Sequence, residues 1–179
     1  MVQPWRPAGR RRLQRCRVFD VDEVRFVRPG HESAEIFYRI EAPEWINVIA
    51  LTDDDQVLFV RQFRFGTEEL TLEIPGGMCD PGEEPIDAAR RELREETGYA
   101  TSDLTRLGAI HPNPAIQTNR CHVFLARGLT EAGPPEPDEH EDFELERVPL
   151  LDVDGLMRDG IVTHSLVVAA FQLLKLREG

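Results

Sequence analysis

Short apolar stretches separated by turn residues run through the middle of the chain. Residues 45–52 and 56–63 are rich in β-branched and aromatic side chains, a composition typical of buried strands. The intervening Asp53-Asp54-Asp55 predicts a turn, so we expect these two segments to form a hairpin. Further strands are predicted for residues 70–74, 120–129 and 143–150.

The segment 85–97 predicts a helix. Pro85 suits the first helical position, where its missing N–H costs nothing, and Gly98 suits a left-handed residue that ends the helix. Apolar positions three and four apart form one stripe, made of Ile86, Ala89 and Leu93. A second helix, apolar along most of its length, is predicted for residues 163–176 with Thr163 as its N-cap.

The N-terminal part has a different character. Residues 18–27 and 34–41 predict two extended segments joined at Pro29-Gly30, which together make an antiparallel β arm. Residues 1–17 are basic and predict a mobile terminus. We therefore expect three parts: residues 1–17, an arm over 18–44, and a main domain over 45–179.

The order of strands and helices predicts a mixed α/β (α+β) fold, with a mixed sheet sandwiched between helices. A hydrophobic content of 41% with 30% charged residues fits a soluble globular protein. The net charge of −12 argues against a nucleic-acid partner. No apolar run approaches the ~18 residues that a membrane span requires, and the basic N-terminus lacks the apolar core of a secretory signal.

The cysteines indicate a reducing compartment. Cys16, Cys79 and Cys121 are scattered and form no CxxC pair, so we expect a cytoplasmic protein without disulfides. Cys79 is interpreted as a small buried filler.

Candidate chemistry gathers on the first predicted helix. Glu92, Glu95 and Glu96 occupy positions i, i+3 and i+4, where Cβ atoms are about 5–6 Å apart. Their mutual repulsion is unfavourable unless cations neutralise it, and hard oxygen ligands favour Mg²⁺ or Mn²⁺. Glu83 lies in the preceding loop, and Arg91 is placed to pair with a carboxylate. Any single glutamate fits a solvated helix face equally well, but the whole arrangement favours metal-assisted chemistry.

The same residues carry a family resemblance. Residues 77–99 read G-x5-E-x7-R-E-U-x-E-E-x-G-U, with U an apolar residue, and this resembles the signature box of the Nudix hydrolases. Tyr99 stands where an aliphatic residue is more usual. The resemblance implies an α/β/α Nudix fold and hydrolysis of a diphosphate linked to another moiety. It also implies that the carbonyl of Gly76 and the side chains of Glu92, Glu95 and Glu96 bind the metal.

Regions outside the box resemble the ADP-ribose pyrophosphatase subfamily. They are residues 57–64 with 72–77, Pro114 fifteen residues after the box, and the acidic residues 139–142 before a predicted strand. The resemblance implies that Glu139 or Glu141 is the general base, and that Arg91 and Glu95 belong to the catalytic centre. The residues implied to contact substrate are Arg64, Glu73, Pro114 and Trp45.

Alternatives stay open for these residues. Residues 139–142 are equally well a solvated loop, Arg64 and Glu73 are alternatively an ion pair with each other, and Trp45 is more often core than a base-stacking platform. Residues 111–122 lack the Ser-Pro-Gly run of ADP-ribose enzymes and are similar to broader nucleoside-diphosphate-sugar hydrolases. His111 and His122 fit no zinc spacing, so hydrogen-bonded loop histidines are the preferred interpretation.

The sequence thus predicts Mg²⁺- or Mn²⁺-dependent hydrolysis of the pyrophosphate bond of ADP-ribose or a related nucleoside diphosphate sugar. The products would be a nucleoside monophosphate and a sugar phosphate. The arm resembles one that such enzymes exchange across a homodimer. Alternative functions are a nucleoside triphosphate pyrophosphatase, or a non-catalytic ADP-ribose-binding module, although such modules often lose box carboxylates that are all present here.

Overall fold

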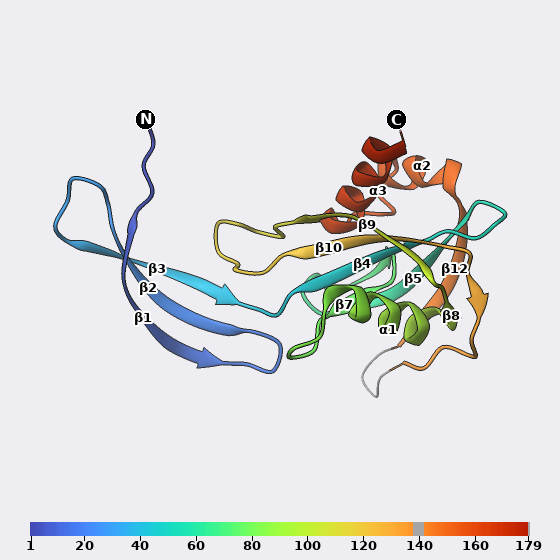
Figure 1. The fold of residues 1–179 in the computed structure, drawn as a ribbon, viewed down its shortest axis with the longest axis horizontal. Helices are drawn as coiled ribbons and strands as arrows, with labels where there is room; N and C mark the ends of the chain where they lie inside the picture. Colours follow the sequence, from blue (N-terminus) through green and yellow to red (C-terminus); the bar gives the residue numbers. More distant parts are fainter. Residues whose placement is uncertain (138–141, 179) are drawn as a thin grey trace. The chain divides into compact units, whose positions relative to one another are not determined.

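The structure is a computed structural model that describes residues 1–137 and 142–178 (Figure 1). The chain divides into two compact units. The first contains residues 1–43 and 111–120, and the second contains residues 44–110 and the chain from Cys121 onward.

The N-terminal unit is built on an antiparallel three-stranded sheet in the order β1-β2-β3. Its strands are β1 (Arg6–Arg15), β2 (Asp20–Val27) and β3 (Ala34–Glu41), drawn in blue in Figure 1. The predicted segments 18–27 and 34–41 correspond to β2 and β3. Residues 111–120 join the sheet edge, because the backbone N–H of Ile40 donates to Ile116 at 2.7 Å.

Strand β1 differs from the expectation of a mobile basic terminus. Its arginines lie against acidic residues of β2, with Nε of Arg12 2.6 Å and Nε of Arg10 2.7 Å from the Asp22 carboxylate. Asp22 is fully buried, and Arg11 pairs with Glu23 at 2.8 Å. Charge complementarity between neighbouring strands therefore orders a segment that has almost no apolar residues.

The larger unit contains a mixed sheet in the order β7-β4-β10-β9. Its strands are β4 (Trp45–Ala50), β7 (Gly76–Met78), β9 (Asp103–Ile110) and β10 (Cys121–Arg127). β4 and β10 run parallel, whereas β7 and β9 are antiparallel to their neighbours. β7 and β9 were not expected from the sequence, since both are rich in small or polar residues.

A second sheet in the same unit has the order β12-β5-β6 and is antiparallel. It is formed by β5 (Gln56–Arg64), β6 (Glu69–Glu73) and β12 (Phe143–Pro149). Two short strands, β8 (Tyr99–Ala100) and β11 (Thr130–Glu131), form a separate pair.

The expected hairpin of β4 and β5 is wrong, because the two strands belong to different sheets. The turn does form: the N–H of Thr52 donates to Gln56 at 2.9 Å, and Leu51 and Val57 make one isolated bridge. Beyond that bridge β4 pairs with β10 on one edge and with β7 on the other.

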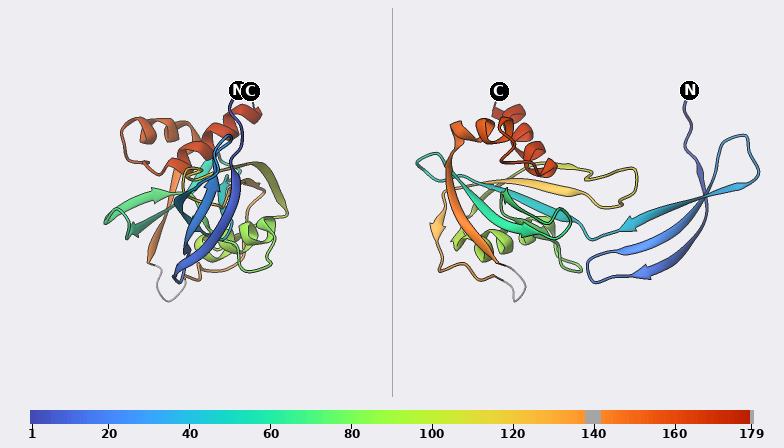
Figure 2. Two further views of the ribbon diagram at one scale, coloured as in Figure 1. Left: turned by 90° about the vertical axis from the view of Figure 1, so that its left-hand side faces the viewer. Right: turned by 180° about the vertical axis from the view of Figure 1, so that it is seen from behind.

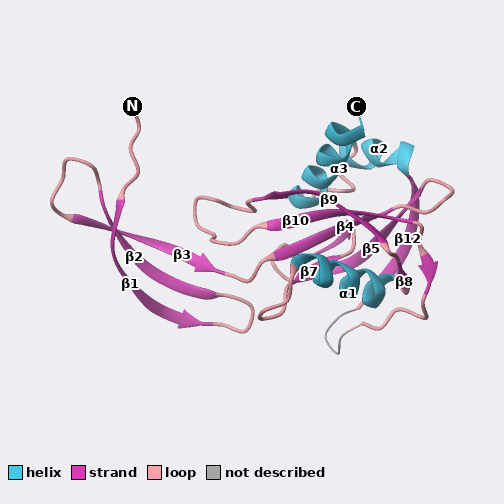
Figure 3. Cartoon of the chain, viewed as in Figure 1, coloured by secondary structure: helices cyan, strands magenta, loops and turns pink. Residues whose placement is uncertain are grey.

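Helices cover both faces of the strands in the larger unit (Figures 2 and 3). They are α1 (Pro85–Thr97), a 3-10 turn η1 (Leu150–Asp152), α2 (Val153–Arg158) and α3 (Ser165–Glu178). α3 begins two residues after the predicted N-cap Thr163. Within the described ranges, no helix has the length and apolar character needed to cross a bilayer.

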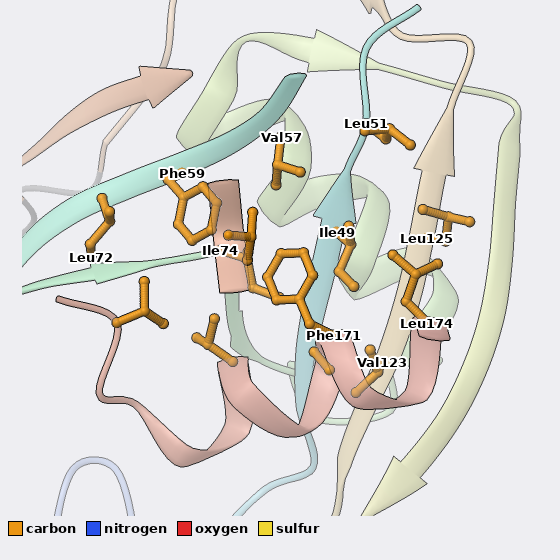
Figure 4. Packing of buried hydrophobic residues seen from close by; sticks show 14 residues of the cluster. Ile49, Leu51, Val57, Phe59, Leu72, Ile74, Val123, Leu125, Phe171 and Leu174 are labelled. Atoms are coloured by element: carbon orange, nitrogen blue, oxygen red, sulfur yellow. The ribbon is translucent and has the colours of Figure 1, made fainter. Parts of the chain in front are cut away.

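Two buried clusters hold these layers together. The α3 side packs Phe171 against Phe59 with stacked rings 5.9 Å apart, among aliphatic side chains of both sheets (Figure 4). The α1 side packs Ala88, Ala89 and Leu93 against strand residues. Ile86 is 36% exposed and is not part of that stripe, so its predicted place in the core is wrong. The arrangement agrees with the predicted sandwich of a mixed sheet between helices.

Candidate active site

The helix α1 carries the candidate metal ligands, and its sequence defines both of its ends. Pro85 occupies the first turn, and Gly98 adopts φ 74° while its N–H donates to the carbonyl of Arg94 at 2.8 Å. Glu92 and Glu96 are 9% and 4% exposed, which is unusual for carboxylates and marks a side of the helix that faces protein. Glu95 is half-buried.

Strand β7 passes directly against these carboxylates. The N–H of Gly76 donates to Oε2 of Glu96 at 2.9 Å. A Cβ atom on Gly77 would lie 2.2 Å from Oε1 of Glu92, so any side chain at this position would displace the Glu92 carboxylate. The glycine pair therefore forms a cradle that brings backbone carbonyls and side-chain carboxylates into one small space.

Arg91 is bonded to the carboxylates around it, as the sequence predicted. Its Nη1 atom donates to Glu92 at 2.8 Å and to Glu95 at 3.1 Å. Its Nε and Nη2 atoms donate to the two oxygens of Glu83 at 3.0 and 2.9 Å, and Nη2 also reaches the carbonyl of Met78. This guanidinium lowers the pKa of Glu83 and is itself held charged by the surrounding acids.

The donor set fits a divalent cation. One cationic nitrogen of Arg91 is shared by oxygens of Glu92 and Glu95, so these oxygens already converge on a single positive centre. All the predicted ligands, including the Gly76 carbonyl, are hard oxygen donors of the kind that Mg²⁺ and Mn²⁺ prefer. Among the described residues, no group of three or more His, Cys, Asp or Glu is arranged around an ion position as it stands. Binding an ion therefore requires these carboxylates to exchange their present partners for it.

Arg64 and Glu73 form the ion pair that was the open alternative for them. Nε and Nη2 of Arg64 each donate to a different oxygen of Glu73 at 2.8 Å, and the Thr71 hydroxyl donates at 2.7 Å. Burial raises the pKa of Glu73, but the bond and charge of Arg64, the charge of His164 and the bond from Thr71 together outweigh it, and the pKa is lowered overall. The Arg64 side chain is 44% exposed, so its pairing with Glu73 does not remove it from the surface.

The acidic loop after β11 is attached to the site helix. The N–H of Glu136 donates to the carbonyl of Glu95 at 2.7 Å, and Arg94 pairs with the Glu136 carboxylate at 2.7 Å. The sequence did not point to this anchor. The predicted bases, Glu139 and Glu141, lie outside the described residues, and their role stays a prediction.

The remaining candidates belong to other elements of the chain. Trp45 is half-buried in β4, opposite Met78 of β7 and Cys121 of β10. Pro114 is exposed in the N-terminal unit. His122 lies in β10, where its ring nitrogens contact Glu44 at 2.6 Å and Arg106 at 3.0 Å, so it is hydrogen-bonded as expected, but in a strand.

Two variable box positions, Cys79 and Tyr99, are filled by side chains that pack against the α1 cluster. Cys79 is 7% exposed within the α1 cluster, and burial raises its pKa to about 11, which suits an inert filler. Tyr99, the departure from the usual aliphatic residue, packs against the same cluster while its ring lies under Arg147, 5.9 Å from the guanidinium carbon. The Tyr99 ring therefore packs in the position where an aliphatic side chain is more usual, and it also contacts Arg147 of β12.

Comparisons with known proteins identify the family of the chain. Residues 43–169 match the NUDIX domain family, and the chain belongs to that family. It is 37% identical over 140 residues to the ADP-ribose pyrophosphatase of Bacillus subtilis (strain 168), covering 78% of this chain and 76% of that one. It is 32% identical over 122 residues to the ADP compounds hydrolase NudE of Escherichia coli (strain K12), covering 68% and 65%.

A solved structure agrees as well. The crystal structure of an ADP compounds hydrolase superposes with a TM-score of 0.85 and 27% sequence identity, covering 98% of this chain and 94% of that one. The expected Nudix fold and the resemblance to the ADP-ribose pyrophosphatase subfamily are thus confirmed. The chain is a Nudix hydrolase, an enzyme class that generally uses divalent metal ions, and its relatives support hydrolysis of nucleoside diphosphate derivatives.

Proposed function

We propose that this protein hydrolyses the pyrophosphate bond of ADP-ribose or a related nucleoside diphosphate sugar with Mg²⁺ or Mn²⁺. The products are a nucleoside monophosphate and a sugar phosphate, which for ADP-ribose are AMP and ribose 5-phosphate. The convergence of Glu92 and Glu95 on one cationic nitrogen, beside the cradle of Gly76 and Gly77, is the observation that carries the proposal.

Glu92, Glu95 and Glu96 hold the metal together with the carbonyl of Gly76. The ion, when bound, neutralises phosphate oxygens and makes water a better nucleophile. Before the ion binds, Arg91 holds Glu92 and Glu95 close together through Nη1, and its bonds to Glu83 keep the guanidinium beside the site when these two carboxylates turn to the ion. The tie between Gly76 and Glu96 supports this assignment, because it holds the strand and the helix at hydrogen-bonding distance.

Glu139 or Glu141 accepts the proton of the attacking water. Support comes from the described part of the same loop, whose Glu136 is bonded to the backbone of Glu95 in the metal-binding helix. The double variant Glu139→Gln, Glu141→Gln is expected to keep Mn²⁺ affinity and to lower kcat by about 10²–10⁴-fold, the usual contribution of general base catalysis. Unchanged turnover would remove both residues from the mechanism.

Arg64 binds a substrate phosphate and Glu73 orients it. A guanidinium offers a planar fork of donors that matches phosphate oxygens. The Arg64 side chain remains partly exposed although it forms two hydrogen bonds to Glu73. Trp45 and Pro114 complete the proposed set of substrate contacts, in line with the subfamily resemblance.

A hydrolysis panel tests the substrate class. Purified protein with Mg²⁺ is assayed on ADP-ribose, ADP-glucose, GDP-mannose, a nucleoside triphosphate and a dinucleoside tetraphosphate, and the products are identified. We expect the nucleoside diphosphate sugars to be cleaved to a monophosphate and a sugar phosphate. Dominant cleavage of the triphosphate would contradict the proposal and indicate a nucleoside triphosphate pyrophosphatase. Tight ADP-ribose binding without cleavage would indicate a non-catalytic module.

We also propose that residues 18–44 form a dimerisation arm and that residues 45–179 carry the hydrolase. Support comes from exposed apolar side chains on β3: Ile36, Phe37 and Tyr38 are 51%, 41% and 61% exposed. Sedimentation at micromolar concentration is expected to show a dimer, and a monomer alone would contradict this assignment. Three free cysteines, two of them buried, support a cytoplasmic location. We further propose that neither nucleic acid nor a membrane is a partner, and the net charge of −12 supports the first of these.

A further inference from the structure

A polar cluster lies where β6 meets the start of α3. The Glu73 carboxylate, 1% exposed as a residue, receives Arg64 on both oxygens and Thr71 on Oε1. On the other side, Nδ1 of His164 lies 3.2 Å from Oε2 of Glu73. That nitrogen is buried, and within the described ranges it has no hydrogen-bond partner of ordinary geometry. A buried polar atom of this kind calls for a specific neighbour, and Glu73 is the neighbour at hand.

The surroundings of His164 favour its neutral form. Burial lowers its pKa, and although the charge of Glu73 raises it, the net shift is downward, with the charge of Arg64 acting in the same direction as burial. His164 also precedes the first residue of α3 and its carbonyl accepts from Val168, so a positive charge here would oppose the helix dipole.

A neutral imidazole carries a single N–H, and its location is decided by Glu73. If the proton were on Nε2, a lone pair of Nδ1 would face the lone pairs of the carboxylate at 3.2 Å. With the proton on Nδ1, the ring instead donates toward Oε2. Arg64 and Thr71 then bond to Oε1, Arg64 bonds to Oε2, and the N–H of His164 lies 3.2 Å from Oε2.

We propose that His164 is a positioning residue for substrate binding, acting through Glu73 on the orientation of Arg64. A carboxylate held at both oxygens fixes the plane of the guanidinium that pairs with it in a two-pronged contact. The guanidinium then meets the substrate phosphate already oriented, which improves binding by reducing the ordering required. This inference rests on the proposed contact of Arg64 with substrate phosphate.

The test compares two replacements of His164. In His164→Asn the side-chain NH₂ can take the place of the Nδ1 donor, whereas His164→Leu has similar bulk and no donor. Steady-state kinetics with ADP-ribose and Mg²⁺ are expected to show a KM raised about tenfold in His164→Leu with kcat within about twofold, and near-normal constants in His164→Asn. His31→Leu, in the exposed turn between β2 and β3, is the matched control and is expected to behave as the wild type.

Arg64→Lys separates this inference from the proposed function. If Arg64→Lys leaves KM unchanged, Arg64 does not bind substrate and the proposed role of that residue fails. If Arg64→Lys raises KM while His164→Leu does not, or if His164→Asn is as impaired as His164→Leu, the role of His164 is overturned.

The protonated ring nitrogen of His164 can also be determined in the wild-type protein, so this test does not depend on the folding of a variant. Long-range ¹H–¹⁵N correlation of the imidazole signals reports which ring nitrogen carries the proton. We expect His164 in the Nδ1–H form near neutral pH. The Nε2–H form would overturn the inference.

Discussion

The carboxylate of Glu96 accepts a hydrogen bond from the backbone N–H of Gly76 at 2.9 Å, across twenty positions of sequence. The bond joins the helix that carries the acidic residues to the strand that supplies a backbone carbonyl. It holds the Glu96 carboxylate beside the backbone of β7, so the cradle depends on a contact between the two elements.

Replacing Gly77 by Ala is expected to impair the site and spare the fold. The added Cβ would lie 2.2 Å from Oε1 and 2.5 Å from Cδ of Glu92, and the end of that side chain can move away. We expect Mn²⁺ affinity to fall about tenfold and kcat by about 10²-fold, because one ligand is displaced, with a melting temperature close to wild type. Manganese titration and thermal melting by circular dichroism check both.

Gly76→Ala is the matched comparison. Its Cβ would meet the backbone carbonyl of Ile46 at 2.5 Å, which cannot move without disturbing β4, so this variant is expected to lose stability. Wild-type metal affinity in Gly77→Ala would show that Glu92 does not need its observed position.

Arg91→Lys is expected to destabilise the metal-free protein more than the metal-bound protein. A lysine ammonium cannot match the fork by which Arg91 reaches Glu83, Glu92 and Glu95 together, so repulsion between these acids increases. Saturating Mg²⁺ supplies positive charge at the same oxygens and should restore part of the loss. Melting temperatures measured with and without Mg²⁺ test this, and an equal decrease in both conditions would speak against a shared cation position.

The Glu73 pair makes stability depend on pH in a predictable direction. The folded pKa of Glu73 lies below its ordinary value of 4.5, so the pair stabilises the protein above that value and is lost as pH falls through the folded pKa. Glu73→Gln is expected to cost about 1–2 kcal/mol at pH 7, since a charged hydrogen bond is lost while Arg64 remains partly solvated. Urea unfolding at pH 7 and near pH 3 should show that the difference from wild type narrows in acid. A constant difference would contradict the assignment.

Asp22→Asn is expected to loosen the N-terminal sheet. Burial raises the pKa of Asp22, but side-chain bonds to Arg12 and Glu41 and the charges of Arg10 and Arg12 outweigh it, so the pKa is lowered overall. Without that charge, Arg10 and Arg12 lose their shared buried counter-ion and repel each other more strongly. Limited proteolysis with trypsin, followed by mass spectrometry, should show faster cleavage within residues 6–15 and unchanged rates in α3. Unaltered cleavage of β1 would show that other contacts order it.

Local signals in the sequence predicted the helix of the site well. Pro85, Gly98 and the spacing of the glutamates act within one helix, where contacts depend only on nearby residues. Pairing between strands was harder to predict: apolar pattern showed that 45–50 and 56–64 are buried, but not that they belong to different sheets. An apolar pattern predicts which residues are buried. Which strands pair depends on contacts with segments distant in sequence, and the pattern does not reveal those.

Other features depended on neighbours that periodicity does not reveal. β1 is ordered by carboxylates on β2, which an apolar pattern cannot show. Ile86 has helical spacing and still lies exposed, because the core beneath α1 is filled by Ala88, Ala89 and Leu93. The contacts of Arg64 and His164 with Glu73 join segments distant in sequence, so only the fold brings them together.

Binding of Mn²⁺ to wild type and Glu96→Gln, followed by electron paramagnetic resonance of the free ion, tests the metal site most directly. Glutamine can still accept the N–H of Gly76, so the fold should persist while a charged ligand is lost. We predict saturable binding to the wild type, an affinity at least about tenfold lower in the variant, and a parallel loss of ADP-ribose hydrolysis. Equal Mn²⁺ binding by the two proteins, or none by the wild type, would contradict the account.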